Sequence, residues 1–333
     1  MQGVIFAEPA SYYLPGKNIM HKTIFAIRVA LIMSCTTGIC HSEPSKECTS
    51  GLKLQDYEPN TIVFRKDDND ERNIDIKLSQ MYPLFHNGCE YSDLSDLSWP
   101  FKPYFALTAQ FGFYALGERE SSPVIGKRFN PKLFFRHFLG DEGEHGYIDI
   151  GIAHESNGQS IQDETSFLAK QREYIDRGER AEFANDHISR GWDYLDLTLK
   201  LINEKSNYKT SQVYLMLKYF LEDGPFQGEP EEVYSWETDD PKSRSEVDGI
   251  SLMWKSTKIT DIFNSELKFS FLYTTGYENI IKNNTFKIEA TFKHQKAPPI
   301  FVWYSDGYNA DLTDYHKKVA RYGIGFELVN FNL

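Results

Sequence analysis

The sequence predicts an all-β protein, a transmembrane antiparallel β-barrel of twelve strands of the bacterial outer-membrane type. Three observations favour this fold. Aromatic residues make up 15% of the 333 residues, with 24 Phe and 20 Tyr, which is typical of strand-rich proteins. From residue 104 onward, segments of about ten residues alternate apolar and polar side chains between turn-like stretches. The chain also begins with an apparent export signal, which would deliver it to the required compartment.

The first part of the chain has the features of a targeting segment. Residues 1–19 fit no part of such a segment and are interpreted as an over-called start, with Met20 as the second candidate N-terminus. Residues 20–42 are interpreted as a signal peptide, because a short basic region and an apolar run precede small residues at a cleavage-like site. The alternative is a buried N-terminal helix, which stays open because Arg28 interrupts the apolar run of the signal.

Between the signal and the barrel the sequence is polar. Residues 43–100 are expected to form an irregular N-terminal segment, and the charge run at 65–72 is expected to be a solvated loop. The barrel is expected to occupy residues 101–333. Cys48 and Cys89 remain after the signal, and export would allow them to pair in a disulfide. The sequence contains no Cys-x-x-Cys pair and no Cys/His spacing typical of a metal site.

The alternating segments predict strands with one apolar and one polar face. A soluble β-sandwich would alternate in the same way, with its apolar faces turned inward. The export signal and a last alternating segment, residues 322–328, that runs almost to the terminus favour a barrel. In lipid only a closed barrel leaves no unpaired strand edge. About ten to twelve candidate strands can be counted, and twelve satisfies the even number of such barrels. The clearest segments are 105–115, 213–219, 266–273 and 286–292.

Composition excludes two other classes of protein. No apolar run reaches the roughly 18 residues that a membrane-spanning helix needs. The net charge of −12 argues against nucleic acid as a partner.

Polar residues interrupt two of the apolar faces. Side chains alternate along a strand, so His154 and Ser156 share the apolar face of the segment that they end. Their Cα atoms are expected roughly 6.5–7 Å apart, a separation that a Ser–His hydrogen bond can bridge. Asp193 begins the apolar face of the next strand. If the two strands pair antiparallel, the sequence predicts Ser156 as nucleophile, His154 as base and Asp193 as the acceptor that orients the base.

A lone His or Ser is most often an ordinary surface or core residue. Three polar groups on otherwise apolar faces indicate a site, because an ionisable group that faces lipid is costly. No G-x-S-x-G elbow is present, so a soluble α/β-hydrolase is not indicated.

These residues lie in two runs, HESNG at 154–158 and SRGWD at 189–193. Together the runs resemble the bipartite signature of the outer membrane phospholipase A family. Further similarity lies at 120–123, 130–134, 304–315 and 321–328. The resemblance extends from about residue 104 to the end of the chain and is patchy between residues 222 and 262.

The resemblance implies a phospholipase A1/A2, a carboxylic ester hydrolase of the outer membrane that cleaves sn-1 or sn-2 acyl esters of phospholipids. It implies dependence on Ca²⁺ and activation by homodimerisation. Ser156 would be the nucleophile and His154 the base, and the backbone N–H of Gly158 would help to bind the oxyanion. The calcium ligands would be the Ser189 hydroxyl, the Gln159 carbonyl and Ser121 of the partner subunit. Such oxygen ligands suit this hard cation.

The sequence departs from the family pattern in four places. Asp193 stands where the family usually has Asn, Gly191 where it usually has Ser, and Gln159 where Arg is common. Residues 161–188 form an insert between the two runs, which the family joins by a very short loop. The insert is expected to be extracellular, with a helix from Glu164 to Arg177. It is interpreted as a solvated loop or, as a sharper hypothesis, as a lid or partner-docking element over the site.

Two other functions remain open. One is a different outer-membrane acyl hydrolase, such as a lipopolysaccharide deacylase with the same Ser–His chemistry. The other is a catalytically silent structural barrel or pore, which the charged lumen of a narrow twelve-strand barrel disfavours.

Overall fold

The computed structural model describes residues 54–68, 70–84, 100–114, 124–206, 209–237, 242–260, 265–294 and 297–328. The predicted signal peptide, the over-called start, Cys48 and Cys89 lie outside these residues, so the predictions made for them stay predictions.

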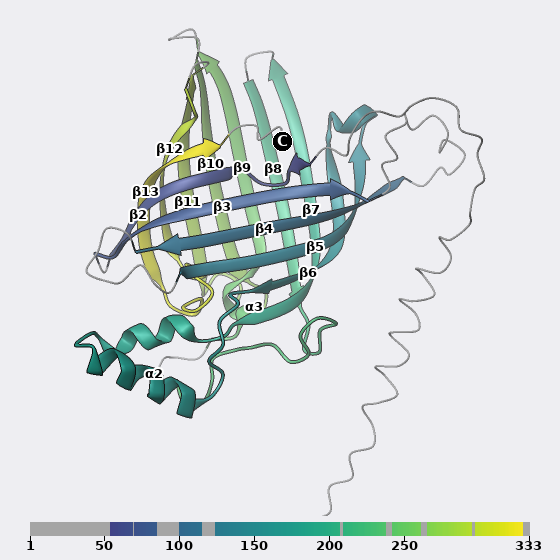
Figure 1. Ribbon diagram of the computed structural model, residues 1–333. Helices are drawn as coiled ribbons and strands as arrows, with labels where there is room; N and C mark the ends of the chain where they lie inside the picture. The colour runs from purple at the N-terminus through teal and green to yellow at the C-terminus, as the bar shows by residue number, and fades with distance from the viewer. Residues whose placement is uncertain are drawn as a thin grey trace, which may run out of the picture. The chain divides into compact units, whose positions relative to one another are not determined.

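The described residues form a closed antiparallel barrel of twelve strands, β2 to β13 (Figure 1). Each strand pairs with its neighbours in the sequence, and β13 pairs with β2, from Arg321 opposite Asp67 to Leu328 opposite Asn60, which closes the sheet. A two-residue strand, β1 (Gln55–Asp56), pairs with the end of β3. The strands are β2 (Asn60–Asp67), β3 (Arg72–Pro83), β4 (Phe101–Phe113), β5 (Ile125–Leu139), β6 (Gly146–Ser156), β7 (Gly191–Ser206), β8 (Lys209–Phe220), β9 (Gly249–Thr260), β10 (Ser265–Gly276), β11 (Asn284–His294), β12 (Ile300–Gly307) and β13 (Val319–Leu328). The predicted fold class and strand number are confirmed.

The barrel begins earlier than the sequence predicts. The expectation of a polar, irregular segment up to residue 100 is wrong for β2 and β3, which are both barrel strands. The charge run at 65–72 covers the end of β2, the exposed turn residues Asp68 and Asp70 and the first residue of β3, so it is a solvated loop only in part. Arg65 misleads because it points into the barrel, where it is buried and pairs with Asp75 at 3.2 Å and with Asp311 at 3.0 Å. A strand whose inner face carries charges is hard to tell from a charged loop in the sequence.

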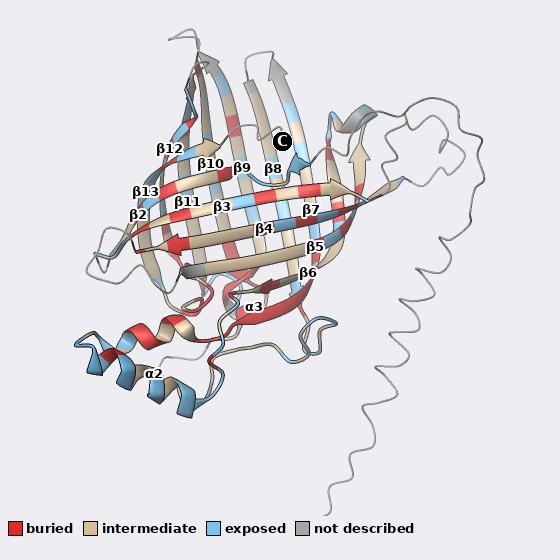
Figure 2. Cartoon of the chain, in the orientation of Figure 1, coloured by how far each residue is buried: buried red, intermediate tan, exposed pale blue. Residues whose placement is uncertain are grey.

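The outer face of the barrel is apolar and the inner face is polar. Along the strands, exposed apolar residues alternate with buried or half-buried ones (Figure 2). Buried charges pair inside: Arg136 binds Asp149 through two hydrogen bonds of 2.7 and 2.8 Å, and Lys132 pairs with Asp196. Such an inverted arrangement is stable only where lipid surrounds the barrel. Exposed apolar side chains include Phe105, Leu107, Leu133, Phe135, Ile150, Leu195, Leu197, Leu215, Trp254, Phe269, Phe271, Val302 and Ile324.

The longest of the connections that the structure describes lie at one end of the barrel (Figure 1). Between β6 and β7 the chain forms the helix α2 (Glu164–Asp176) and the 3₁₀ helix η3 (Ala181–His187); between β8 and β9 it forms the short helix α3 (Arg244–Val247). A single-turn 3₁₀ helix, η2 (Asp141–Gly143), joins β5 to β6. No helix in the described part of the chain is long and apolar enough to cross a membrane.

The insert contains the helix that the sequence predicts. The side chain of Asp163 caps α2 by accepting a hydrogen bond from the Ser166 N–H, at 2.9 Å. The helix ends before Gly178, which has the positive φ of 78° that glycine adopts without strain. Buried Tyr174 and Phe183 form a small apolar cluster between α2 and η3. The insert therefore has a core of its own.

Candidate active site

Strands β6 and β7 bring the predicted catalytic residues together. They pair antiparallel in a register that sets His154 opposite Asp193 and Ser156 opposite Gly191. Ile150 and Leu195, on the same faces of these strands, are exposed on the outside of the barrel. His154, Ser156 and Asp193 therefore project from the outer face, at the end of the barrel that carries the long connections.

A hydrogen bond of 2.7 Å joins Nδ1 of His154 to Oδ1 of Asp193. An ionised carboxylate can only accept, so Nδ1 must carry the proton and donate. Nε2 of the imidazole is then the nitrogen that can accept a proton. The His154 side chain keeps 22% of its surface exposed, whereas the Asp193 side chain is fully covered. The orienting group is thus protected and the base remains accessible.

The cover over Asp193 comes from the connection between β8 and β9. The backbone N–H groups of Phe226 and Gln227 donate to Oδ2 of Asp193, at 2.7 and 3.2 Å. The Phe226 ring lies edge-on to the His154 imidazole, with 6.5 Å between ring centroids. Hydrogen bonds to a buried carboxylate offset the cost of removing its charge from water. They explain how a charged residue is accommodated on a lipid-facing wall.

Ser156 lies half-buried on the same face, one strand repeat beyond His154. Among the described residues, no hydrogen bond joins Ser156 to His154. Catalytic hydrogen bonds are often long before substrate binds and tighten in the complex, so the two side chains remain compatible with a nucleophile and its base.

Asn157 fastens the two halves of the signature to each other. This residue is 2% exposed. Its Nδ2 donates to the Ile188 carbonyl at 2.8 Å, and its Oδ1 accepts from the N–H of Arg190 at 3.0 Å. Oδ1 also accepts from the Gln159 N–H at 3.2 Å. The residues on either side of the insert are therefore held next to one another.

Gly158 follows directly and has a positive φ of 61°, a conformation that favours glycine. The chain thus turns sharply after Ser156. The backbone N–H of Gly158 comes two residues after Ser156 in the sequence, and its role as the oxyanion donor stays a prediction.

The predicted calcium ligands are partly described. The Ser189 hydroxyl donates to a carboxylate oxygen of Glu231, and the N–H groups of Gln159 and of Arg190, the residue after Ser189, both donate to Oδ1 of Asn157. Ser121 lies outside the described residues. No three His, Cys, Asp or Glu side chains gather into a metal site in the described part of the chain. The candidate metal-ligand atoms are nevertheless all oxygens, namely the Ser189 hydroxyl, the Gln159 carbonyl and the Glu231 carboxylate, and this set fits Ca²⁺.

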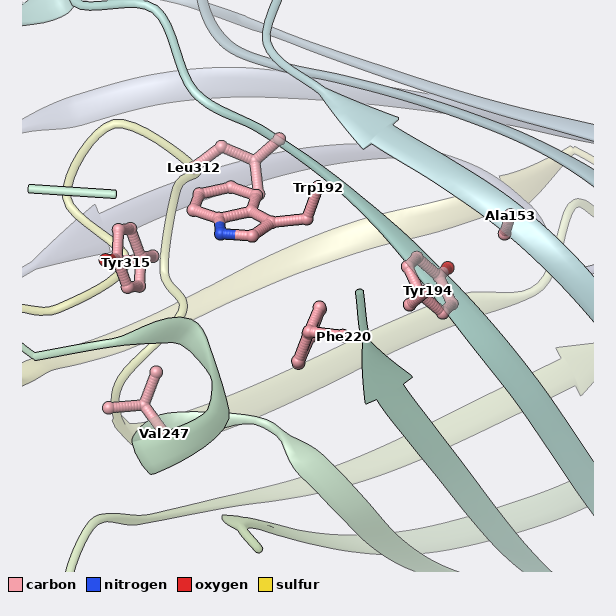
Figure 3. Packing of buried hydrophobic residues seen from close by; sticks show 7 residues of the cluster. All are labelled: Ala153, Trp192, Tyr194, Phe220, Val247, Leu312 and Tyr315. Carbon is pink, nitrogen blue, oxygen red and sulfur yellow. The ribbon is translucent and has the colours of Figure 1, made fainter. Parts of the chain in front are cut away.

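The inner side of the wall behind the site is tightly packed. Figure 3 shows Trp192 and Tyr315 among the buried residues of this cluster, with Ala153, Tyr194, Phe220, Val247 and Leu312. Trp192 lies beside Asp193 on the opposite face of β7, is fully buried, and donates from its indole N–H to Glu232 at 3.1 Å. Neighbouring Arg190 is also fully buried and binds both carboxylate oxygens of Glu237 at 2.7 Å. The site therefore rests on a rigid wall.

Sequence reasoning missed Phe226, Gln227 and Glu231. All three lie in the connection between β8 and β9, where the similarity to the family is patchy, and no local pattern marks them. Their roles depend on how that connection folds back over β7.

No protein-family model matches the sequence, and no curated protein matches it either. Solved structures do resemble it. An active-site mutant of outer membrane phospholipase A from Escherichia coli, in which alanine replaces an asparagine, gives a TM-score of 0.58 at 16% identity, covering 86% of this chain and 95% of that chain. Another structure of the Escherichia coli enzyme gives 0.57 at 16% identity, covering 85% and 95%.

A calcium-bound dimer of the Salmonella typhi outer membrane phospholipase gives a TM-score of 0.56 at 16% identity, covering 85% of this chain and 94% of that chain. At this identity the likeness concerns the fold. The closed twelve-strand barrel with its apolar outer face is a bacterial outer-membrane β-barrel with the fold of outer membrane phospholipase A.

Proposed function

We propose that this protein is a calcium-dependent outer-membrane phospholipase that hydrolyses the sn-1 or sn-2 acyl esters of phospholipids. The observation that carries the proposal is the hydrogen bond between His154 and Asp193 on the lipid-facing wall, with Ser156 next on the same face. A phospholipid acyl chain that lies along the apolar outer face would bring its ester to this end of the barrel.

Each residue has one role in the proposed reaction. The Ser156 hydroxyl attacks the ester carbonyl while Nε2 of His154 takes its proton. Asp193 holds the imidazole by Nδ1 and stabilises the imidazolium that forms. The Gly158 N–H donates to the oxyanion. His154 then protonates the leaving lysophospholipid oxygen. A water molecule, deprotonated by His154, attacks the acyl–Ser156 ester and releases the fatty acid.

The proposed calcium site uses the Ser189 hydroxyl and the Gln159 carbonyl. When bound, the cation would stabilise negative charge on the ester carbonyl oxygen. Ser121 of the partner subunit would complete the site, so activity would require a homodimer.

The test is fatty-acid release from mixed phospholipid–detergent micelles by refolded residues 43–333, first with Ca²⁺ and then with a chelator. We expect calcium-dependent release, and almost no turnover by a Ser156→Ala variant that folds normally. Turnover retained in that variant would refute the assignment of the nucleophile. Release of fatty acid from lipopolysaccharide but not from phospholipid would favour the deacylase. Conductance in a planar bilayer without any hydrolysis would favour the pore.

A further inference from the structure

The chain that follows β8 folds back over β7 and covers Asp193. We call residues 221–228 the strap. Its first residue, Leu221, donates its N–H to the Asp193 carbonyl at 2.9 Å. Gly224 and Gly228 then exchange two backbone hydrogen bonds of 2.9 and 3.1 Å, which close residues 224–228 into a tight turn. The strap is thus tied both to β7 and to itself.

Three donors converge on the Asp193 carboxylate. Nδ1 of His154 donates to Oδ1, and the N–H groups of Phe226 and Gln227 donate to Oδ2. The strap also approaches very closely, because a Cβ on Gly224 would overlap the carboxylate. Both oxygens therefore face donors only, inside a covered site.

Asparagine at position 193 cannot satisfy these donors. Its side chain has one acceptor oxygen and one NH₂ group. If the oxygen faces His154, the NH₂ meets the two N–H groups of the strap. If the oxygen faces the strap, the NH₂ can only donate to Nδ1 of His154, which forces the imidazole proton onto Nε2 and leaves no nitrogen free to act as the base. The first arrangement opposes donors in a buried place, and the second gives the imidazole the wrong tautomer. The strap thus requires a carboxylate.

The same strap explains the glycine at position 191. A Cβ on Gly191 would lie 2.6 Å from Oε1 of Gln227. Nε2 of Gln227 donates to the Gly191 carbonyl at 2.9 Å, which holds the carboxamide over this spot. Gly191 lies opposite Ser156 in the register. The Gln227 side chain therefore occupies the space that a serine at position 191 would need.

We propose that the strap is a positioning element of the active site, and that it is the physical reason for Asp at 193 and Gly at 191. Phe226 and Gln227 act through Asp193, which orients His154. The inference rests on the proposed hydrolase function. It adds that asparagine at position 193 cannot take the place of aspartate in that site.

The first experiment measures fatty-acid release by an Asp193→Asn variant with Ca²⁺ present. We expect kcat to fall about tenfold to a hundredfold, the size of one lost hydrogen bond to a buried charge, with KM changed less than about twofold. Asp223→Asn is the matched control, because it removes the same charge from an exposed strap residue with no hydrogen-bond partner in the described part of the chain. It should stay within about twofold of the wild-type rate. Wild-type activity in Asp193→Asn would overturn the proposal.

The second experiment repeats the substitution in a chain that lacks residues 225–227. Gly224 and Gly228 are already hydrogen-bonded partners, so the deletion joins neighbouring points of the backbone. Without the two strap donors, Asn and Asp at 193 should differ by less than about threefold. An unchanged penalty for Asn in both backgrounds would show that the strap does not impose the carboxylate.

A readout that is independent of turnover separates this inference from the proposed function. Hydrogen exchange of the peptide 221–228 reports the Phe226 and Gln227 amides directly. These amides should exchange at least about tenfold faster in Asp193→Asn than in the wild type. If the wild-type protein hydrolyses no lipid but hydrogen exchange responds as expected, the proposed function is refuted and the inference about the strap is supported. If exchange does not change, the strap inference fails, whatever the activity.

Discussion

Replacing Asn157 with alanine should loosen the junction between the two halves of the signature. The substitution removes the partners of two backbone groups on the far side of the insert, the Ile188 carbonyl and the Arg190 N–H, bonded at 2.8 and 3.0 Å. Each buried group left unsatisfied costs about 1–3 kcal/mol, and water that enters the vacated space recovers part of this. A net local loss of about 2–4 kcal/mol follows, whereas the barrel itself keeps all its strand pairs.

Hydrogen exchange in detergent micelles measures this loss directly. A decrease of about 2–4 kcal/mol in the free energy of local opening speeds amide exchange roughly thirtyfold to several hundredfold. The effect should be confined to peptides that contain residues 157–162 and 187–191. Asn203→Ala is the control, because Asn203 is exposed near the far end of β7, and its peptide should exchange as in the wild type.

The same variant connects stability with function. Because Asn157 accepts hydrogen bonds from both Gln159 and the residue after Ser189, its loss should separate the two proposed calcium ligands and raise the Ca²⁺ concentration needed for half-maximal activity. Asn157→Asp keeps the acceptor for the Arg190 N–H but sets a second oxygen against the Ile188 carbonyl in a buried place, so it should not restore the exchange rates of the wild type. Wild-type exchange in Asn157→Ala at both peptides would refute the claim that this side chain fastens the junction.

Three further outcomes are expected. Burial lowers the pKa of His187 from 6.5 to about 4; the unfolded insert therefore binds a proton that the folded insert does not, and protease cleavage within the insert should rise as the pH falls from about 6.5 to 4, but not in His187→Gln. Replacing residues 162–187 with a short turn should change activity or calcium affinity, and unchanged kinetics would rule out a lid. Arg244→Met removes one of the two cationic partners of buried Glu155, at 2.7 Å, and leaves it only Arg128, at 3.3 Å, so urea unfolding in vesicles should show a loss of about 2–4 kcal/mol. Lys287→Met, in a more exposed pair, should cost less than about 1 kcal/mol.

The sequence predicts well what depends on strand periodicity. Outward apolar faces repeat every two residues, so the barrel fold and the common face of His154 and Ser156 follow from local pattern, whereas the number of strands comes from the even-number rule. The helix of the insert is also local, because its cap and its helix-forming residues are contiguous. The same reasoning fails for β2, where Arg65 points into the lumen and pairs with Asp311, a residue distant in the chain. Charges that are buried in pairs look the same in sequence as charges in solvent.

The prediction is weakest for the connection between β8 and β9. Its residues have no periodicity, and their partners lie on β7 and in the insert. The departures at positions 191 and 193 are visible in the sequence as isolated substitutions. Their common cause becomes visible only when Gln227 and Phe226 are placed over them, because a contact between a loop and a strand leaves no local signature.

The way in which the two ends of the insert meet makes a long insert compatible with this site. The ends of the insert already meet, because Ile161 donates to the His187 carbonyl at 3.0 Å and accepts from the Ser189 N–H at 2.8 Å. The insert can therefore change in length without separating the two halves of the signature.

Its body rests on the connection between β8 and β9, which also holds the catalytic residues. Phe167 of α2 packs on Trp236, with ring centroids 4.7 Å apart, and Gln162 donates to Glu231 at 2.8 Å. Glu231 in turn accepts from the Ser189 hydroxyl. A displacement of the insert thus acts on Ser189 both through the Glu231 carboxylate and through the backbone hydrogen bond to Ile161, whereas Asp193 is held separately by the strap. Changes in the insert should therefore affect calcium affinity before they affect the orientation of the base.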